Sequence, residues 1–190
     1  MKMKVCMLTS GHPPFDDRIF HKEAKSLVKA GYDVTLIAQH DKEEIVDGVK
    51  IINLQKPRNR IERMTKTVWS AYRKAVQVDA VIYHFHDPEL IPIALRLKRM
   101  GKIVIFDSHE DVPKQLLGKP YLNKPAKIIL SRCIELYEKH SCSRFDAIVA
   151  ATPFIRDKFL KINPNTLDIN NFPMIGELAI GHVDWRKKQN

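Results

Sequence analysis

Short apolar runs rich in β-branched residues alternate along the chain with longer segments in which apolar residues recur every three or four positions. The short runs predict strands and the longer segments predict amphipathic helices. The predicted strands are 4–9, 33–38, 49–54, 79–86, 102–107, 145–152 and 167–171. The predicted helices are 18–30, 58–76, 88–100, 126–141 and 153–161. This alternation predicts an α/β fold: a three-layer, Rossmann-like, doubly wound and mostly parallel sheet of about seven strands with helices on both faces.

Three of the predicted helices have an apolar face that is expected to pack on the sheet. The face of 18–30 consists of Ile19, Phe20, Ala24, Leu27 and Val28. The face of 58–76 consists of Ile61, Met64, Val68, Tyr72 and Ala75, with Trp69 beside it. The inward residues of 126–141 are expected to be Ile129, Cys133, Leu136 and Tyr137. Segment 111–125 contains three prolines and one glycine, so it is predicted to be a loop over the edge of the sheet.

The length of 190 residues suits one domain with its own core. Residues 1–173 are interpreted as a Rossmann-like domain, and 174–190 as an interdomain linker or the start of a C-terminal domain, because the alternating pattern stops after Pro173. The three cysteines have no metal-binding spacing, and the first residues resemble a strand rather than a signal peptide. No apolar stretch is long enough to cross a bilayer. These features favour a cytoplasmic protein with free thiols.

The net charge of +10 favours an anionic partner: nucleic acid, an acidic membrane surface or a phosphorylated small molecule. The distribution of charge along the chain helps to distinguish these partners. Nucleic acid is disfavoured, because neither a recognition-helix pattern nor strand aromatics interleaved with basic residues are present. Segment 58–76 is a basic amphipathic helix with Glu62 as its only acid. Its candidates for contact with an anionic membrane surface are Arg60, Arg63, Lys66, Arg73 and Lys74. The alternative interpretation is a surface helix with a solvated outer face.

Two predicted strands end in polar side chains, and the segment between these strands is long enough for one helix. The polar groups are His84, His86 and Asp87 at the first strand end and Asp107, His109 and Glu110 at the second. Strand, helix and strand in this order predict parallel neighbours. The polar groups are therefore expected to meet at the carboxyl edge of the sheet, where open α/β sheets bind ligands.

These polar groups allow two interpretations. His84 and His86 leave the strand on one face and could form a metal site with Asp87, His109 and Glu110. Alternatively, one histidine packs between strand and helix, and the other hydrogen-bonds a substrate hydroxyl or phosphate. The second interpretation is favoured, because metallohydrolases with such histidine pairs also need further ligands at matched positions. No resident metal is predicted.

The turn 10–15 before the first helix is a second candidate region. It lacks the pattern G-x-G-x-x-G, and Pro13 and Pro14 remove two backbone donors, so a dinucleotide cofactor is disfavoured. Asp16 or Asp17 is expected to cap the helix. Arg18 and His21 lie one turn apart and could face the cleft, and the helix N-terminus favours an anion there.

Three segments together resemble the N-terminal half of bacterial family 4 glycosyltransferases. These segments are Ser-Gly-His-Pro-Pro-Phe-Asp-Asp-Arg-Ile-Phe at 10–20, Phe-His-Asp-Pro-Glu-Leu at 85–90 and Asp-Ser-His-Glu-Asp-Val-Pro at 107–113. The turn 170–173 resembles the point at which those enzymes leave their first domain. The resemblance implies a GT-B architecture, with the acceptor mostly on the first domain and the nucleotide-sugar on the second. It also implies retaining, metal-independent transfer without a cofactor.

By position, the resemblance implies that His109 is catalytic and lies close to the transferred sugar. The residues that it implies for binding the acceptor or lining the cleft are Gly11, His12, Asp16, Arg18, His86, Asp87 and Glu110. Gly11 matches the glycine turn that approaches the donor diphosphate and the acceptor. The family's donor-binding half, with its phosphate clamp and paired glutamates, has no counterpart before Asn190.

The chain is therefore predicted to be the acceptor-binding half of a nucleotide-sugar-dependent glycosyltransferase that makes bacterial surface polysaccharide or glycolipid. This half is expected to be inactive without the donor-binding domain. Its expected partners are a sugar or lipid-linked acceptor, a nucleotide-sugar held mainly by the other domain, and the inner face of the cell membrane. The alternative is a stand-alone binding module that recruits a separate donor-binding subunit or tethers it to the membrane.

Overall fold

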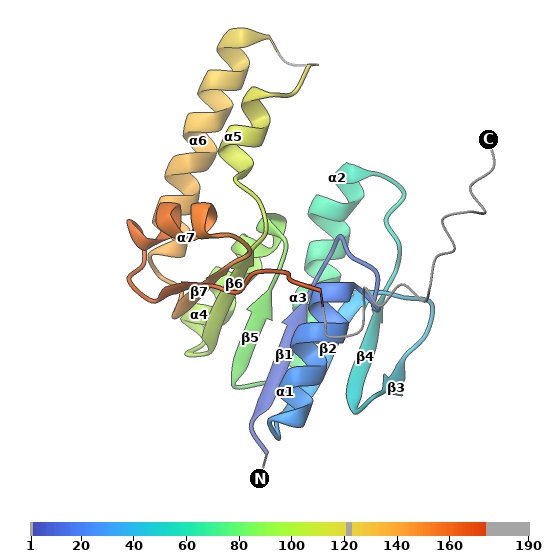
Figure 1. Ribbon diagram of the computed structural model, residues 1–190. Helices are drawn as coiled ribbons and strands as arrows, with labels where there is room; N and C mark the ends of the chain where they lie inside the picture. Colours follow the sequence, from blue (N-terminus) through green and yellow to red (C-terminus); the bar gives the residue numbers. More distant parts are fainter. Residues whose placement is uncertain (1, 121–122, 174–190) are drawn as a thin grey trace, which may run out of the picture.

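The computed structural model describes residues 2–120 and 123–173 (Figure 1). The interpretation of 174–190 as a linker or second domain lies outside the described residues. The strands are β1 (Lys4–Leu8), β2 (Asp33–Gln39), β3 (Glu44–Val46), β4 (Val49–Leu54), β5 (Ile82–Phe85), β6 (Ile103–Ser108), β7 (Ala147–Ala150) and β8 (Thr166–Asp168). The α-helices are α1 (Lys25–Lys29), α2 (Arg60–Glu62), α3 (Val68–Val78), α4 (Ile91–Arg99), α5 (Val112–Leu117), α6 (Lys124–Cys142) and α7 (Pro153–Leu160). The π-helical segments η1 (Asp17–Ala24) and η2 (Arg63–Thr67) and the 3₁₀ segment η3 (Pro88–Leu90) precede α1, α3 and α4.

All eight strands form one sheet in the order β3-β4-β2-β1-β5-β6-β7-β8. Every neighbouring pair is parallel except β3 and β4. The predicted parallel pairing of the strands that end near Asp87 and Asp107 is confirmed, since His84 lies opposite Ile105 and Phe85 opposite Phe106. The strand order reverses between β1 and β5, and such a reversal opens a crevice at the carboxyl ends of the two strands. The predicted doubly wound α/β fold is confirmed.

Strand β3 is an eighth, edge strand that the apolar pattern does not predict. It is three residues long and joins β4 through a turn at Asp47 and Gly48. Both turn residues have positive φ, 51° and 80°, which is the conformation that tight two-residue hairpins require. The segment 44–46 is half exposed and too short to show a period of two, so only its Asp-Gly turn marks it in the sequence.

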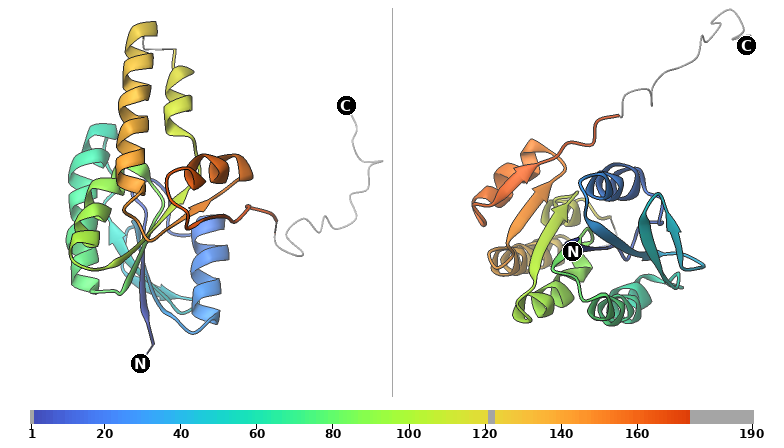
Figure 2. Two further views of the ribbon diagram at one scale, coloured as in Figure 1. Left: turned by 90° about the vertical axis from the view of Figure 1, so that its left-hand side faces the viewer. Right: turned by 90° about the horizontal axis from the view of Figure 1, so that it is seen from below.

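Helices cover both faces of the sheet, and Figure 2 shows α1 on the side opposite α3 and α4. On the first face, Ile19, Phe20 and Ala24 of η1 pack on β1, β2 and β4, and Leu27 and Val28 pack beside them, as predicted. On the second face, a larger cluster joins Ala71 of α3, Leu97 of α4 and Phe159 of α7 to the sheet. No helix in the described part of the chain is long and apolar enough to span a bilayer.

Helices α5 and α6 project beyond the carboxyl edge of the sheet as a hairpin (Figure 1). The prediction of a loop over 111–125 is wrong for 112–117, which forms α5. Pro113 lies in the first turn, where no intrahelical N–H is needed, so proline does not prevent the helix. The Ser131 hydroxyl of α6 donates to the Pro113 carbonyl at 2.8 Å, which holds the two helices together.

The predicted inward face of α6 is wrong. Ile129 and Leu136 are 64% and 67% exposed, and Cys133 and Tyr137 are also exposed. The buried residues are Ser131, Glu138, Ser141 and Cys142. The Lys158 ammonium of α7 binds Glu138 at 2.6 Å and Asp111 at 3.0 Å, so an ion pair occupies the face that was expected to be apolar. Ile128 and Leu130 of α6 are exposed as well, at 53% and 41%.

The predicted apolar face of 58–76 is correct in its second half only. Val68 and Ala75 are buried and Tyr72 packs against the core, but Ile61 and Met64 are 75% and 52% exposed. The first turns belong to α2 and η2, which rise beyond the end of the sheet in Figure 1 and so have no strand to cover.

Candidate functional site

A polar cleft opens at the carboxyl ends of β1, β5 and β6, where the strand order reverses. Its volume is about 320 Å³. It is lined by Gly11, His12, Arg60, Arg63, His86, Asp87, Pro88, Glu89, Phe106, Ser108, His109, Glu110, Val112 and Gln115. The predicted site residues Gly11, His12, His86, Asp87, His109 and Glu110 are thus brought together from three strand ends.

Asp87 fixes the loop that follows β1. Its Oδ2 atom accepts hydrogen bonds from Thr9 Oγ1 at 2.8 Å, Ser10 N at 2.6 Å and Gly11 N at 3.2 Å. A side chain at Gly11 would place its Cβ 2.9 Å from Asp87 Oδ1, which is too close for any real Cβ contact. Glycine at position 11 therefore lets the backbone approach the Asp87 carboxylate. Asp87 in turn holds this loop in place, and the loop forms part of the cleft.

His12 lies at the mouth of the cleft, between two carboxylates. Its Nδ1 is 3.1 Å from Asp16 Oδ2 and its Nε2 is 3.8 Å from Asp87 Oδ1. Asp16 also caps η1 by accepting from the backbone N–H groups of Arg18 and Ile19, as predicted. Burial opposes ionisation of Asp16, but these backbone hydrogen bonds and His12 outweigh it, so the pKa of Asp16 is lowered.

Three imidazole rings form one wall of the cleft. The ring of His109 lies 5.8 Å from that of His12 and 5.7 Å from that of His86, measured between centroids. The side chain of His109 is 22% exposed, whereas that of His86 is fully buried. His109 Nε2 lies 3.5 Å from Asp107 Oδ1, so a carboxylate stands behind the ring. Of the two, His109 is the ring that a ligand in the cleft can reach.

The opposite wall of the cleft carries an arginine–glutamate pair. Arg63 Nε lies 2.8 Å from Glu89 Oε1, and the Ser10 hydroxyl donates to the same oxygen at 3.0 Å. Arg60 lines the cleft beside this pair. The segment η2 therefore reaches across to the loop after β1, and the first two membrane candidates, Arg60 and Arg63, lie in the cleft.

The other membrane candidates, Lys66, Arg73 and Lys74, line a second hollow between the end of β4 and α3. Its volume is about 710 Å³, and Lys56 and Arg58 add to its positive charge. Glu62 is the one acid that lines it. Trp69, 44% exposed, forms part of its wall.

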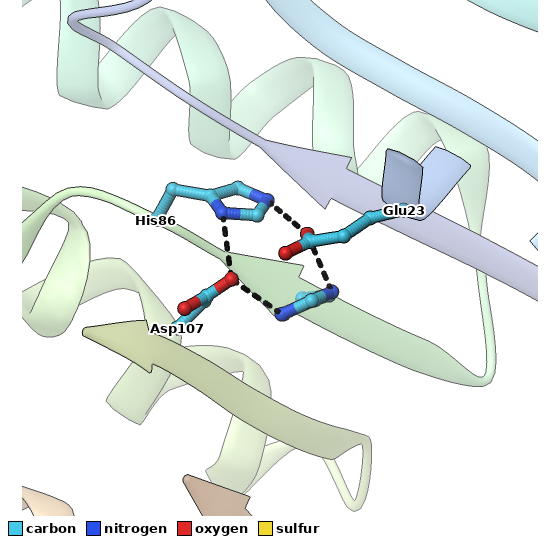
Figure 3. A group of neighbouring side chains, drawn as sticks. Glu23, His86 and Asp107 are labelled. Carbon is cyan, nitrogen blue, oxygen red and sulfur yellow. Dashed lines mark ion pairs between the residues drawn. The ribbon is translucent and has the colours of Figure 1, made fainter. Parts of the chain in front are cut away.

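Beneath the cleft lies a cluster of largely buried charged and titratable groups, Arg18, Glu23, His84, His86 and Asp107, which we call the buried cluster. Figure 3 shows Glu23, His86 and Asp107 of this cluster. The guanidinium of Arg18 binds both oxygens of Asp107 at 3.1 Å and lies 2.9 Å from Glu23 Oε1. Asp107 has no exposed side-chain surface, and Arg18 is 4% exposed. Arg18 therefore neutralises a carboxylate in the interior and does not line the cleft.

Burial is the main cause of the unusual pKa values in the buried cluster. Burial, helped by the nearby Asp107 carboxylate, raises the pKa of Glu23 to about 10. Burial also lowers the pKa of His84 to about 3, with His86 acting in the same direction, and it lowers the pKa of His86. For Asp107, burial opposes ionisation, but interactions with His109 and His86 outweigh it, so its pKa lies well below the usual range. At neutral pH, Asp107 is therefore ionised and Glu23 is protonated.

The sequence gives no prediction for Glu23 and assigns no role to Glu89, although both are central. Glu23 follows Ile19 by four positions and Phe20 by three, so it lies on the apolar stripe of the first helix. An acid within such a stripe is the signal that could have identified it. Glu89 lies in the quoted segment 85–90, but its partner Arg63 belongs to a helix that the sequence assigns to the surface.

Comparison with known proteins gives the class of this domain. In structure, the chain is similar to sucrose-phosphate synthase from Thermosynechococcus elongatus, with a TM-score of 0.64 and 15% identity over 89% of this chain and 48% of that one. It is also similar to LpCGTa in complex with UDP (TM-score 0.60, 11% identity, 95% and 55% covered). A third similar structure is the catalytic domain of starch synthase IV from Arabidopsis thaliana bound to ADP and acarbose (TM-score 0.59, 11% identity, 90% and 51% covered). The chain thus spans about half the length of these structures.

The fold is that of the N-terminal domain of a GT-B glycosyltransferase. No curated protein sequence matches the chain. The model of Glycosyltransferase Family 4 matches residues 18–168, and the chain belongs to that family.

Proposed function

We propose that the chain is the acceptor-binding half of a retaining, nucleotide-sugar-dependent glycosyltransferase that makes bacterial surface polysaccharide or glycolipid. The observation that carries the proposal is the cleft itself. A reachable imidazole, His109, and the cationic Arg60 and Arg63 line one polar hollow at the edge where α/β sheets bind ligands. Its volume of about 320 Å³ lies at the lower end of the range for small-molecule sites, which suits a sugar unit.

Glycosyl transfer needs a positioned acceptor hydroxyl and stabilisation of the charge on the leaving diphosphate. In the proposal, His12, His109 and Glu110 offer hydrogen bonds to sugar hydroxyls, and Arg60 attracts a phosphate of the donor or acceptor. Gly11 lets a substrate approach the backbone of the loop that Asp87 holds. The second half of the enzyme would hold the nucleotide. The UDP and ADP named for two of the similar structures support a nucleotide-linked donor.

We expect the 190-residue chain alone to transfer no sugar, whereas the full-length gene product does, because one half presents only the acceptor. The measurement is release of labelled sugar from UDP-, GDP- and ADP-sugars to a lipid extract. Turnover by the 190-residue chain would contradict the division into two halves. If the full-length product is this chain and activity appears only on adding a separate donor-binding protein, the stand-alone binding module is the correct alternative.

We further propose that the domain works on the cytoplasmic face of the membrane, supported by its second, basic hollow. Each basic residue near an anionic bilayer contributes about 1 kcal/mol. The double change Lys66→Glu and Arg73→Glu is therefore expected to weaken binding to phosphatidylglycerol vesicles by at least ~10-fold in a co-sedimentation assay. The matched control is Lys29→Glu with Lys50→Glu, two exposed residues of α1 and β4 that do not line this hollow. Equal loss in both variants, or no preference for anionic vesicles, would refute a specific membrane-facing surface.

A further inference from the structure

We propose that Glu23, His84, His86 and Asp107 of the buried cluster form a binding site for one first-row divalent cation, with Zn²⁺ as the best fit. Each residue can supply one ligand atom, and these four atoms all lie within 4.8 Å of one another. This site differs from the metal set considered from the sequence, because Glu23 and Asp107 stand in place of Asp87, His109 and Glu110, and Asp87 binds the loop after β1 instead. The proposal does not depend on the proposed function.

The spacing of the four side chains suits an ion better than direct hydrogen bonds. His86 Nδ1 is 3.5 Å from Asp107 Oδ2, and His86 Nε2 is 3.8 Å from Glu23 Oε2. His84 lies 3.9 Å from Asp107 and 4.0 Å from Glu23. Hydrogen bonds with nitrogen donors need about 2.7–3.2 Å. Ligand atoms around a tetrahedral Zn²⁺ with bonds of about 2.0–2.1 Å lie roughly 3.4 Å apart, so shifts of less than about 1 Å would close the site.

The polar atoms that face this space have no hydrogen-bond partner among the described residues. They include both nitrogens of His86, Nε2 of His84 and Oε2 of Glu23, whereas Oε1 of Glu23 is paired with Arg18 at 2.9 Å. The side chain of His86 is fully buried, so water at the surface cannot reach it. A buried polar atom without a partner costs about 1–3 kcal/mol. A cation among these atoms would accept lone pairs from both imidazoles and both carboxylates at once.

The chemistry of the four ligands indicates the kind of ion. Two imidazoles and two carboxylates without sulfur suit Zn²⁺ and its first-row neighbours, whereas Mg²⁺ and Ca²⁺ prefer oxygen ligands alone. The ion would take the place of the proton on Glu23; with both carboxylates then ionised, Arg18 offsets one of their two negative charges and the ion the other. Arg18 also binds Asp107 and repels the ion, so the affinity should be lower than for the same ligands without an arginine. The ion would tie η1 to β5 and β6 directly beneath His109.

The test is a zinc titration of the 190-residue chain after dialysis against a chelator. We expect one Zn²⁺ per chain by elemental analysis and calorimetry, together with a higher melting temperature. We also expect Co²⁺ to give the intense visible absorption of a four-coordinate site. Glu23→Gln keeps the shape of the side chain but removes a carboxylate ligand, and it should weaken Zn²⁺ binding by at least ~10-fold. Glu23→Gln combined with His86→Asn should abolish it.

The control is His40→Gln with Glu44→Gln, which removes an accessible histidine–glutamate pair with its atoms 2.6 Å apart. This variant should bind Zn²⁺ as the wild type does. Loss of Zn²⁺ in the control but not in the Glu23 variants would assign the ion to the surface and overturn the proposal. No stoichiometric binding by the folded wild-type chain, or a six-coordinate Co²⁺ spectrum, would also overturn it. The cobalt spectrum decides the matter even if the His86 variant does not fold.

Discussion

Replacing Arg18 with leucine is expected to destabilise the domain by about 3–5 kcal/mol, because the change leaves Asp107 as an unpaired charge in the interior. Arg18 holds both oxygens of that carboxylate, which has no exposed surface. Urea unfolding followed by circular dichroism measures the free energy of unfolding. The matched control is Arg156→Leu, which removes the partly exposed ion pair with Asp168 and should change the free energy of unfolding far less, because solvent screens that pair.

A second variant separates the unpaired charge from a simple loss of packing. Combining Asp107→Asn with Arg18→Leu removes the carboxylate charge that Arg18→Leu alone leaves without its partner. The double variant should therefore lose clearly less stability than the sum of the two single variants. Additive losses, or an Arg18→Leu cost equal to that of the Arg156 control, would contradict the role assigned to Arg18.

In the proposed full-length transferase, the His109→Ala change is expected to lower kcat by ~10²-fold or more and to affect KM much less, as loss of a positioned catalytic or electrostatic group does. His109 is the reachable ring of the cleft wall, with Asp107 behind it. Steady-state kinetics with the preferred nucleotide-sugar provides the measurement. His140→Ala, at the exposed C-terminal end of α6, is the control and should leave both parameters unchanged.

The folded state of the His109 variant must be confirmed by its unfolding curve, which should stay close to that of the wild type because the ring is partly exposed. A folded variant with the wild-type kcat would show that His109 supports the structure of the cleft and takes no part in the reaction.

Much of the fold could be predicted because its determinants are local. Runs such as 33–38 and 102–107 specify strands by composition, and Gly31 and Gly101, both with positive φ, end the helices before them. A crossover between 79–86 and 102–107 has one favoured hand and places the two strand ends side by side. The meeting of His86 and His109, ring centroids 5.7 Å apart, follows from these local signals.

The rest could not be predicted because its determinants are distant in the chain. The partner of Arg18 lies 89 positions later, so a sequence motif around Arg18 cannot distinguish a residue of the cleft from one buried beneath it. The periodicity of 126–141 shows an apolar stripe but not that the hairpin extends past the sheet, leaving Ile129 and Leu136 exposed. Glu138 faces inward because Lys158 of another helix meets it.

The path of the chain after β8 is attached to the first helical segment. Arg18 Nη1 donates to the Ile169 carbonyl at 2.6 Å, and Lys22 Nζ reaches Asn171 Oδ1 and the Phe172 carbonyl at 2.8 Å each. Figure 1 shows this last stretch passing alongside the start of that segment. Any partner domain that follows would therefore pivot about a point no earlier than Phe172. Movement of such a domain would pull first on Arg18, the side chain that also neutralises Asp107 beneath His109.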